Sequence, residues 1–465
     1  MVFQNDILAG SSGTPVSSVY KIDQSIRFND DDSAYLSKTW SGAGDKQKFT
    51  FSFWVKRGNI TSRQILLSFR QDVPLEFEAD DTIRVYLFGT TALNTNRVFR
   101  DPSAWYHIVL SVDSTQAVAP ERVRLYVNGV RETSFSTASY PSVNASANIY
   151  TSTLENYIGR ILAGSNYFDG YMAEIHFLDG LGYDPSYFGL FNENGIWIPK
   201  EYSGSYGTNG YKIDGRDSSD LGDDESGNGN DFTTNGLNAH DQVADSPTNN
   251  FCVMNPNNTH SSMTLANGNL QSNASSHSGS GGTILLPSTG KWYAEFRYNS
   301  GLNNEYPVVG VYNPIKRLTT SPLNPGLESG DLDFGVGVDG RRNEDGTKTT
   351  SWSNTITNGK IGAIAIDMTN KKIWFGHNNS GSFVWQGSGD PSSGTNEANT
   401  KDFNDDLIFG NSHYQNSNMT WNFGQDGTFA GTETAQNNSD ANGVGNFYYA
   451  PPTGYLALCT KNMGG

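Results

Sequence analysis

The chain has 465 residues, enough for two or three domains. Apolar residues make up only 35% of it, yet aromatic residues reach 12%, which excludes a disordered chain and favours many short strands joined by glycine- and asparagine-rich turns. The formal net charge of −17 disfavours binding to nucleic acid or insertion into anionic membranes, and no apolar run is long enough to span a bilayer.

The N-terminal residues 1–24 predict an arm without a core of its own. Val2, Phe3, Ile7 and Leu8 form a short apolar stretch, and the Gly- and Ser-rich residues after it are typical of a flexible tether. We expect these four side chains to anchor the chain to a larger particle or to a sister subunit. The arm lacks the basic residues and apolar centre of a secretion signal, so we expect synthesis in a cytosol.

Residues 25–185 predict an antiparallel β-sandwich, because apolar residues recur there with a period of two. The predicted inward-facing sets are Phe49, Phe51, Phe53 and Val55; Tyr106, Ile108, Leu110 and Val112; Val123, Leu125 and Val127; and Tyr171, Ala173, Ile175 and Phe177. Asn128 and Gly129 supply a hairpin turn after the third set.

One acidic stretch in this domain, LEFEADD at 75–81, is a candidate for glycoside hydrolysis. Glu76, Glu78 and Asp80 would share a face of a regular strand. A retaining glycosidase needs two carboxyl groups about 5 Å apart, and positions i and i+4 of a strand are too far apart for that. A solvated acidic face is the favoured interpretation.

Two ring-bearing turns could stack on sugars. They are SNYFDG (165–170), with Tyr167 and Phe168, and GSFVWQGSGD (381–390), with Trp385. The favoured alternative is that each ring covers the edge of its own domain. The 7 His residues lack zinc-site spacing, and neither a nucleophile elbow nor a phosphate loop is present, so we predict no cofactor.

Residues 186–244 predict a Gly-, Asp- and Ser-rich connector. Within it, Asp224, Ser226 and Asn228 occupy steps one, three and five of a calcium loop, but step twelve is Asn235 instead of glutamate. We therefore expect turns in which glycines adopt positive φ. Asp224 and Asn228 stay candidate ligands of a structural calcium ion.

The pattern restarts in residues 245–465, which predict a second sandwich. Strand 290–299 places Trp292, Ala294, Phe296 and Tyr298 on one face, and 359–376 reads as a hairpin around Thr369 and Asn370. Cys252 and Cys459 fall in the expected first and last strands. We expect them to be neighbours that close the domain as buried thiols, since assembly in a reducing cytosol disfavours a disulfide.

Five segments in series resemble the laminin-G and concanavalin A-like lectin and glucanase superfamily: FSFWVKR (51–57), WYHIVLSVDS (105–114), RLYVNG (124–129), NYIGR (156–160) and FDGYMAEIHFLDG (168–180). The second half resembles a SPRY-type domain through 255–269, 290–299, 308–313 and 360–376. The fold class that both imply is two concanavalin A-like antiparallel β-sandwiches in tandem.

The tandem also resembles virion proteins of marine tailed bacteriophages, through FQNDILAG (3–10), SIRFNDDDSAYLS (25–37), SGNGNDFTTNG (226–236), DSPTNNFCVMNP (245–256) and PPTGYLALCTKN (451–462). That resemblance implies a non-enzymatic virion surface protein, such as a tail fibre, a receptor-binding protein or a capsid decoration, assembled in the host cytoplasm. Its expected partners are other virion proteins, sister subunits of a homo-oligomer, and host-surface glycans or proteins. A structural component without a ligand and a polysaccharide depolymerase stay open as alternatives.

Overall fold

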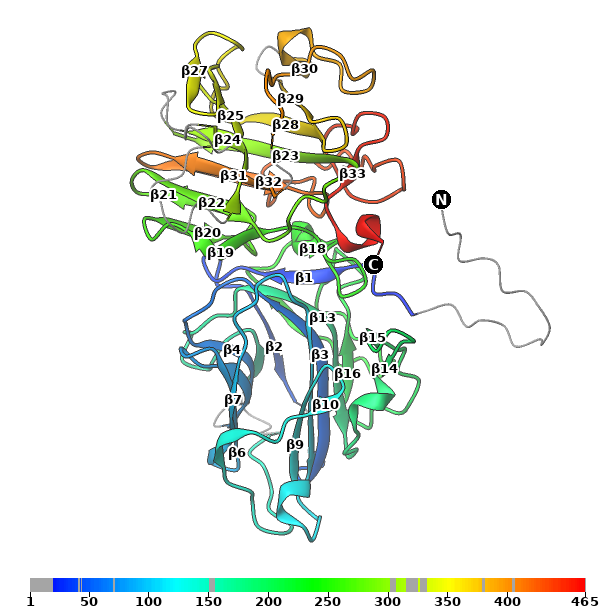
Figure 1. Cartoon of the computed structure of the whole chain (residues 1–465). Helices are drawn as coiled ribbons and strands as arrows, with labels where there is room; N and C mark the ends of the chain where they lie inside the picture. The colour runs from blue at the N-terminus through cyan, green and yellow to red at the C-terminus, as the bar shows by residue number, and fades with distance from the viewer. Residues whose placement is uncertain are drawn as a thin grey trace, which may run out of the picture.

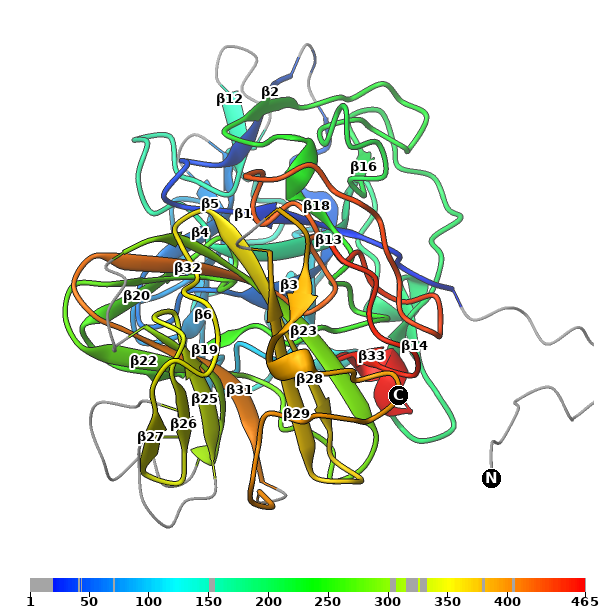
Figure 2. The same ribbon diagram turned by 90° about the horizontal axis from the view of Figure 1, so that it is seen from above.

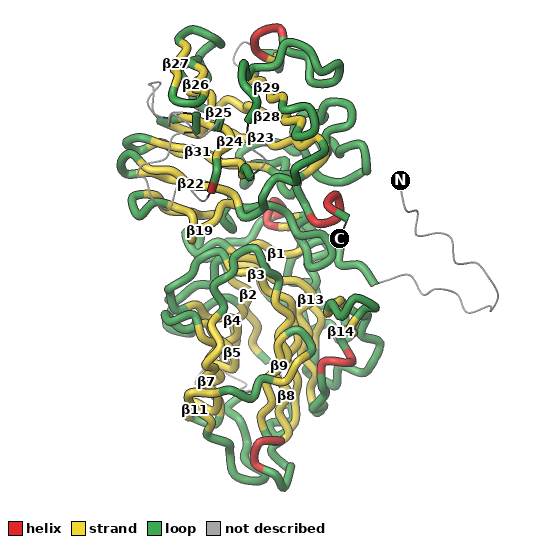
Figure 3. The backbone as a smooth tube through the Cα atoms, in the orientation of Figure 1, coloured by secondary structure: helices red, strands yellow, loops and turns green. Residues whose placement is uncertain are grey.

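The structure, a computed structural model, describes residues 20–40, 42, 44–69, 72–149, 155–301, 307–314, 325–326, 333–378, 381–403 and 406–464. It contains two antiparallel β-sandwiches, the N-terminal one below and the C-terminal one above in Figure 1. Strands dominate both, as the yellow segments of Figure 3 show. The predicted all-β fold class is therefore confirmed.

The first sandwich consists of two eight-stranded sheets. Sheet A has the order β10 (Val130–Arg131), β9 (Val123–Val127), β8 (Tyr106–Asp113), β3 (Lys48–Arg57), β13 (Gly170–Asp179), β1 (Ser25–Phe28) and β18 (Gln242–Val243), and β16 (Tyr211–Ile213) also pairs with β13. Sheet B has the order β11 (Phe135–Ala138), β7 (Thr90–Val98), β6 (Thr82–Leu87), β5 (Asp72–Phe77), β4 (Gln64–Phe69), β12 (Glu155–Ile158), β2 (Tyr35–Thr39) and β17 (Thr233–Asn235).

The core of the first sandwich contains the inward-facing residues predicted for β3, β8 and β9. The turn after β9 is the predicted one, with positive φ at both Asn128 (49°) and Gly129 (76°).

The prediction for β13 is wrong in its first half. Met172 faces the core of the first sandwich, whereas Tyr171 and Ala173 face the second sandwich. A bulge between Ala173 and His176, with φ of 49° at Glu174, inserts one residue and restores the predicted face for the remainder of the strand.

The segment predicted as a connector contributes strands to both sheets of the first sandwich. The strands β16 and β18 join sheet A and β17 joins sheet B, while β14 (Gly189–Phe191) and β15 (Trp197–Pro199) form a separate hairpin. Gly227 and Gly229 have φ of 84° and 67°, as predicted for tight turns. The segment is thus folded onto the first sandwich along much of its length.

The second sandwich pairs a seven-stranded and an eight-stranded sheet. Sheet C has the order β19 (Met254–Thr259), β22 (Ser278–Gly282), β31 (Ile408–His413), β24 (Val308–Tyr312), β25 (Phe334–Gly337), β26 (Arg342–Glu344) and β27 (Thr347–Thr349). Sheet D has the order β20 (Met263–Ala266), β21 (Gln271–Ala274), β32 (Ser417–Asn422), β23 (Lys291–Ser300), β28 (Lys360–Asp367), β29 (Lys372–His377) and β30 (Val384–Trp385), and β33 (Leu456–Ala457) pairs with β23.

The core of the second sandwich contains all four residues predicted to face inward from the 290–299 strand. The predicted 359–376 hairpin is also confirmed, as β28 and β29. Cys252 and Cys459 are free, buried thiols. They lie in adjacent stretches, since the Cys252 N–H donates to the Leu458 carbonyl at 3.1 Å and Phe251 forms a β-bridge with Cys459. The prediction that they are buried neighbours is confirmed, but neither lies in a strand, because Cys252 precedes β19 and Cys459 follows β33 directly before η5.

The helical elements whose two ends both lie within the described residues are short 3₁₀ turns: η1 (Ala119–Glu121), η2 (Pro185–Tyr187), η3 (Ala239–Asp241), η4 (Gln386–Ser388) and η5 (Thr460–Met463). Among the residues that the structure describes, no helix has the length and apolar character that a membrane crossing needs.

Buried polar contacts fix one sandwich against the other. Arg27 of β1 pairs with Asp426 of the second sandwich at 2.7 Å, and both side chains are buried. Lys56 of β3 pairs at 2.7 Å with Asp245, in the segment that leads into the second sandwich. The Tyr171 hydroxyl donates to the Gly268 carbonyl at 2.6 Å. In Figure 2, which looks down on the second sandwich, the strands of the two sandwiches overlie one another across this junction.

Candidate functional site

A groove of about 640 Å³ lies beside the junction of the two sandwiches, and we call it the tryptophan groove. Its walls come from strand β3, the residue before β8, the β9–β10 turn, the β14–β15 hairpin, the segment after β18, and η5. The lining residues are Trp54, Trp105, Asn128, Phe191, Asn192, Gly195, Ile196, Trp197, Ile198, Pro199, Pro247, Thr248, Asn250 and Thr460. Three indoles thus meet at a place where distant parts of the chain converge.

The position of Trp197 depends on two glycines. A Cβ atom on Gly129 would lie 2.3 Å from the Trp197 ring, and one on Gly189 would lie 2.4 Å from it. The absence of side chains lets the indole rest directly on the β9–β10 turn and on β14. Its Nε1–H donates to Nδ1 of His107 at 3.0 Å, and the two rings stack 5.9 Å apart. One face and one edge of Trp197 are therefore fixed before any ligand arrives.

The other aromatic walls differ in exposure. Trp54 and Trp105 are only 5% and 9% exposed, and the Trp105 Nε1–H donates to Asp245 at 3.0 Å. Phe191 and Ile196 are 50% and 58% exposed, and the Phe191 ring meets Trp197 edge-on at 4.9 Å. The hairpin thus offers apolar surface to solvent, which is costly unless something covers it.

Behind the groove, His107 connects Trp197 to Ser52. An indole N–H can only donate, so Nδ1 of His107 must accept and Nε2 must carry the ring proton. That proton points to the Ser52 hydroxyl at 2.9 Å, so His107 is not oriented to deprotonate Ser52. Burial lowers the pKa of His107 to about 3, so the ring is neutral over the physiological range.

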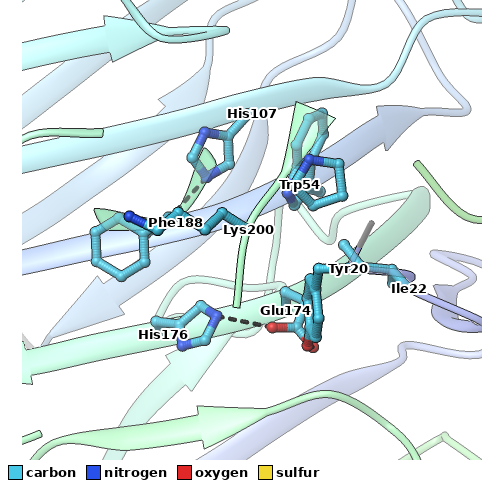
Figure 4. A pocket seen from close by; sticks show the side chains of 10 residues that line it. Tyr20, Ile22, Trp54, His107, Glu174, His176, Phe188 and Lys200 are labelled. Carbon is cyan, nitrogen blue, oxygen red and sulfur yellow. Dashed lines mark hydrogen bonds and ion pairs between the residues drawn. The ribbon is translucent and has the colours of Figure 1, made fainter. Parts of the chain in front are cut away.

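A second polar cluster lies next to Trp54 and His107 (Figure 4). His176 contacts Glu174 at 3.0 Å, and the Tyr20 hydroxyl donates to the same carboxylate at 2.8 Å. Burial would raise the pKa of Glu174, but the hydrogen bond from His176, the charge of Lys212 and the hydrogen bond from Tyr20 outweigh it and lower the pKa to about 2. The cavity there measures about 0 Å³, so this pair is a packed support of the bulge in β13.

The lining of the tryptophan groove is aromatic and apolar, with a few amide and hydroxyl groups. No charged side chain is among its described lining residues. Flat aromatic faces and a few amide and hydroxyl groups are typical of recognition sites for neutral, partly apolar ligands.

The comparisons with known proteins concern the first sandwich most directly. Residues 28–181 match the concanavalin A-like lectin/glucanases superfamily. Trp54, Trp105 and Asn128 lie within the matched range, whereas the β14–β15 hairpin follows it. No curated protein sequence matches the chain.

Several solved structures are similar to parts of the chain. The SPRY domain of human HERC1 shares 16% identity and has a TM-score of 0.28, covering 36% of this chain and 96% of that one. A putative carbohydrate binding protein from Bacteroides ovatus shares 19% identity with a TM-score of 0.34, covering 47% of this chain and 59% of that one. Stonustoxin shares 16% identity with a TM-score of 0.29, and the match spans 27% of its chain.

The three ring residues predicted to contact ligand are not brought together with the tryptophan groove. Phe168 is fully buried and packs 5.9 Å from Phe28, so its prediction is wrong, because the ring fills the core of the first sandwich. Tyr167 is partly exposed at 6.2 Å from Tyr35. Trp385 is partly exposed and packs against Phe383 at 5.2 Å, in the second sandwich.

The candidate calcium ligands are engaged in hydrogen bonds. The Asp224 carboxylate accepts from the backbone N–H groups of Lys212, Ser226 and Asn230 at 2.8–2.9 Å. Asn228 turns its amide nitrogen, rather than its oxygen, toward the carbonyls of Gly207 and Gly210. Within the described residues, no group of three or more His, Cys, Asp or Glu side chains is arranged to hold a metal ion. The loop residues present therefore do not fit a calcium ion.

The acidic stretch that suggested hydrolysis is solvated only in part, because Asp80 is exposed and Glu78 partly exposed, whereas Glu76 is buried. Glu76 is buried and pairs with Arg63 at 2.7 Å and with Arg84, which also pairs with Glu78 at 2.6 Å. Asp80 instead accepts from the hydroxyl of Thr82 at 2.6 Å. Arg63 and Arg84 thus occupy the carboxylates of Glu76 and Glu78, which a glycosidase would keep available.

The predicted anchor, Val2, Phe3, Ile7 and Leu8, lies outside the described residues. The β14–β15 hairpin was not predicted, because its segment has the composition of a connector. The available signal was LFNENGIWIP (190–199), in which apolar residues flank an Asn–Gly turn.

Proposed function

We propose that the protein binds glycans through the tryptophan groove and acts as a non-enzymatic surface protein of a phage virion. The observation that carries the glycan assignment is the fixed, partly exposed Trp197 ring, flanked by Phe191 in a groove without charged lining. The superfamily match of residues 28–181 supports the same ligand class.

A sugar ring suits this groove for physical reasons. Its C–H face is apolar and stacks on an indole, whereas its hydroxyl groups need hydrogen-bond partners at the rim. The volume of about 640 Å³ is within the range typical of small-ligand sites, about 300–1,000 Å³. Because Trp197 is positioned by His107 and two glycines, little side-chain entropy is lost when a ligand stacks on it.

The virion role rests on the sequence resemblance described above. We propose that the protein is assembled in the host cytoplasm, that its partners are other virion proteins and further copies of itself, and that the groove contacts glycans of the host surface. The pairing of Glu76 and Glu78 with arginines supports binding without hydrolysis.

A glycan array followed by titration of the hits tests the glycan assignment. Trp197→Ala is expected to lower affinity about fivefold or more, because one stacked ring contributes on the order of 1 kcal/mol or more. Trp385→Ala, which removes a partly exposed indole outside the groove, is the matched control and should leave affinity unchanged. Loss of binding in the Trp385 variant alone would place the site in the second sandwich.

Hydrolysis is tested separately, by incubating algal and bacterial polysaccharides with the protein and measuring reducing ends. We expect none. Product release that Glu76→Gln or Glu78→Gln abolishes would establish the depolymerase instead.

A further inference from the structure

In two amide side chains of the tryptophan groove, the oxygen is hydrogen-bonded within the protein but the nitrogen is not. Oδ1 of Asn192 already accepts from the N–H groups of Asn194 and Ile196, at 3.0 and 2.9 Å. Oδ1 of Asn128 accepts from the His107 N–H at 2.7 Å. In the described part of the chain, the Nδ2 group of either amide has no hydrogen-bond partner. Both therefore offer N–H donors to the groove.

The other polar residues that line the groove also use their oxygens as acceptors within the protein. Thr460 accepts from the Asn250 N–H at 3.0 Å, which leaves its hydroxyl hydrogen to donate. Thr248 is engaged with the backbone of Ile22 in both directions. The Asn250 oxygen accepts from Lys56 and one of its two amide N–H groups donates to the Ser103 carbonyl, which leaves the second N–H as a further donor. The side chains thus keep free N–H and O–H donors, whereas each of their oxygens already accepts at least one hydrogen bond.

Charge does not compensate for this imbalance. The nearest buried ions, Lys56 and Asp245, neutralise each other at 2.7 Å beneath Trp105. An anionic ligand would find donors but no cation, on a chain with a net charge of −17. A ligand with cationic groups would place its own donors against those of the groove. The best complement is an uncharged acceptor next to an apolar group.

We propose that the tryptophan groove is selective for saccharides that carry acetamido groups, that is, for chains containing N-acetylhexosamine. This proposal rests on the proposed function. The carbonyl oxygen of an acetamido group accepts from the free N–H and O–H donors, and its methyl group packs on the exposed apolar wall formed by Phe191 and Ile196. A plain hydroxyl in the same position supplies neither the strong acceptor nor the methyl.

Three tetrasaccharides with one β-1,4-linked backbone isolate this preference. Cellotetraose has a hydroxyl at C2, tetra-N-acetylchitotetraose has an acetamido group, and the deacetylated chitosan tetramer has an ammonium group. By calorimetric titration at 0.15 M salt, we expect the acetamido compound to bind about tenfold more tightly than cellotetraose. The ammonium compound should bind weakest once salt screens its attraction to the acidic chain.

Asn192→Asp tests the donor directly. The substitution keeps the oxygen that accepts from Asn194 and Ile196 and replaces the amide N–H group by an acceptor. It is expected to reduce the preference for the acetamido compound to less than about threefold. Asn194→Asp adds the same charge to an exposed residue of the same hairpin that does not line the groove, and should preserve the preference.

The outcomes separate the two proposals. If cellotetraose binds as tightly as the acetamido compound and Trp197→Ala abolishes both, the groove binds glycans and the acetamido selectivity is refuted. If none of the three tetrasaccharides binds, the selectivity is refuted, and the array decides the glycan assignment. If the acetamido compound binds but Trp197→Ala has no effect, the site lies elsewhere and both proposals fail.

Discussion

Replacing Lys56 by methionine removes the cation that neutralises Asp245 at the junction of the sandwiches. The Lys56 Nζ atom lies 2.7 Å from the Asp245 carboxylate, 2.7 Å from the Asn250 amide oxygen and 3.0 Å from the Phe251 carbonyl. Both charged side chains are fully buried. Removing one partner of such a pair leaves an uncompensated buried charge and typically costs about 3–5 kcal/mol. We therefore expect the variant to lose a large part of a total stability of about 5–15 kcal/mol.

The assay is urea unfolding followed by tryptophan fluorescence, since Trp105 donates to Asp245 and reports on the junction. Lys48→Met is the matched control, because Lys48 is 40% exposed and lies 4.0 Å from Asp113, and it should cost less than about 1 kcal/mol. The double variant Lys56→Met/Asp245→Asn should recover part of the loss. A deficit below about 1 kcal/mol for Lys56→Met would refute the reasoning.

The pH dependence supplies a second criterion for Lys56→Met. Burial raises the pKa of Asp245 even in the intact pair, although Lys56 opposes the shift. A carboxyl group with a raised folded-state pKa contributes stability below its unfolded pKa, and this contribution is lost as the pH rises through the folded-state pKa. Without Lys56 the pKa rises further, so the deficit of the variant should be largest near pH 7 and should shrink toward pH 4. A deficit that is constant over this range would contradict the assignment.

Three further predictions concern other parts of the molecule. Gly189→Ala places a Cβ atom 2.4 Å from the Trp197 ring and should lower glycan affinity at least about tenfold with little change in Tm. Unchanged affinity in titration would contradict the role of Gly189 in positioning the Trp197 ring. Glu295 is buried, accepts four hydrogen bonds and has a pKa raised by burial to about 7, so its contribution to stability should fall as the pH rises from about 4.5 through 7. Glu295→Gln should cost about 2–3 kcal/mol at low pH and flatten this dependence, as read from Tm between pH 4.5 and 8. Cys252 and Cys459 should react with a thiol reagent only after denaturation, and fast labelling of the native protein would disprove their burial.

The fold was predictable from the sequence because alternation reports directly on burial. The apolar face of β3 and that of β23 both follow the period of two, and the hairpin turn at Asn128 and Gly129 follows from the positive φ values that those residues tolerate. The bulge at Glu174 could not be read in this way, because an inserted residue changes the facing of side chains without changing the composition of the strand.

The candidate site was less predictable, because its walls are far apart in the chain. Trp54, Trp197 and Thr460 meet only through the docking of the hairpin and of the second sandwich, and no local pattern encodes that contact. For Phe168 the local pattern was misleading. A ring in a Gly- and Asp-rich turn suggests exposure to solvent, but this ring is buried in the core. Local sequence specified which residues are apolar, but tertiary packing decided which of them face solvent.

The walls of the tryptophan groove belong to both sandwiches, so a bound ligand would act as a noncovalent cross-link between them. The first sandwich alone supplies the indoles but lacks Pro247, Thr248 and Thr460, so we expect the proposed ligand to be released when either sandwich unfolds or separates. Binding and docking of the sandwiches are therefore thermodynamically linked. A ligand at one hundred times its Kd adds about 2.7 kcal/mol to the free energy of unfolding of the docked sandwiches, and both sandwiches are stabilised together.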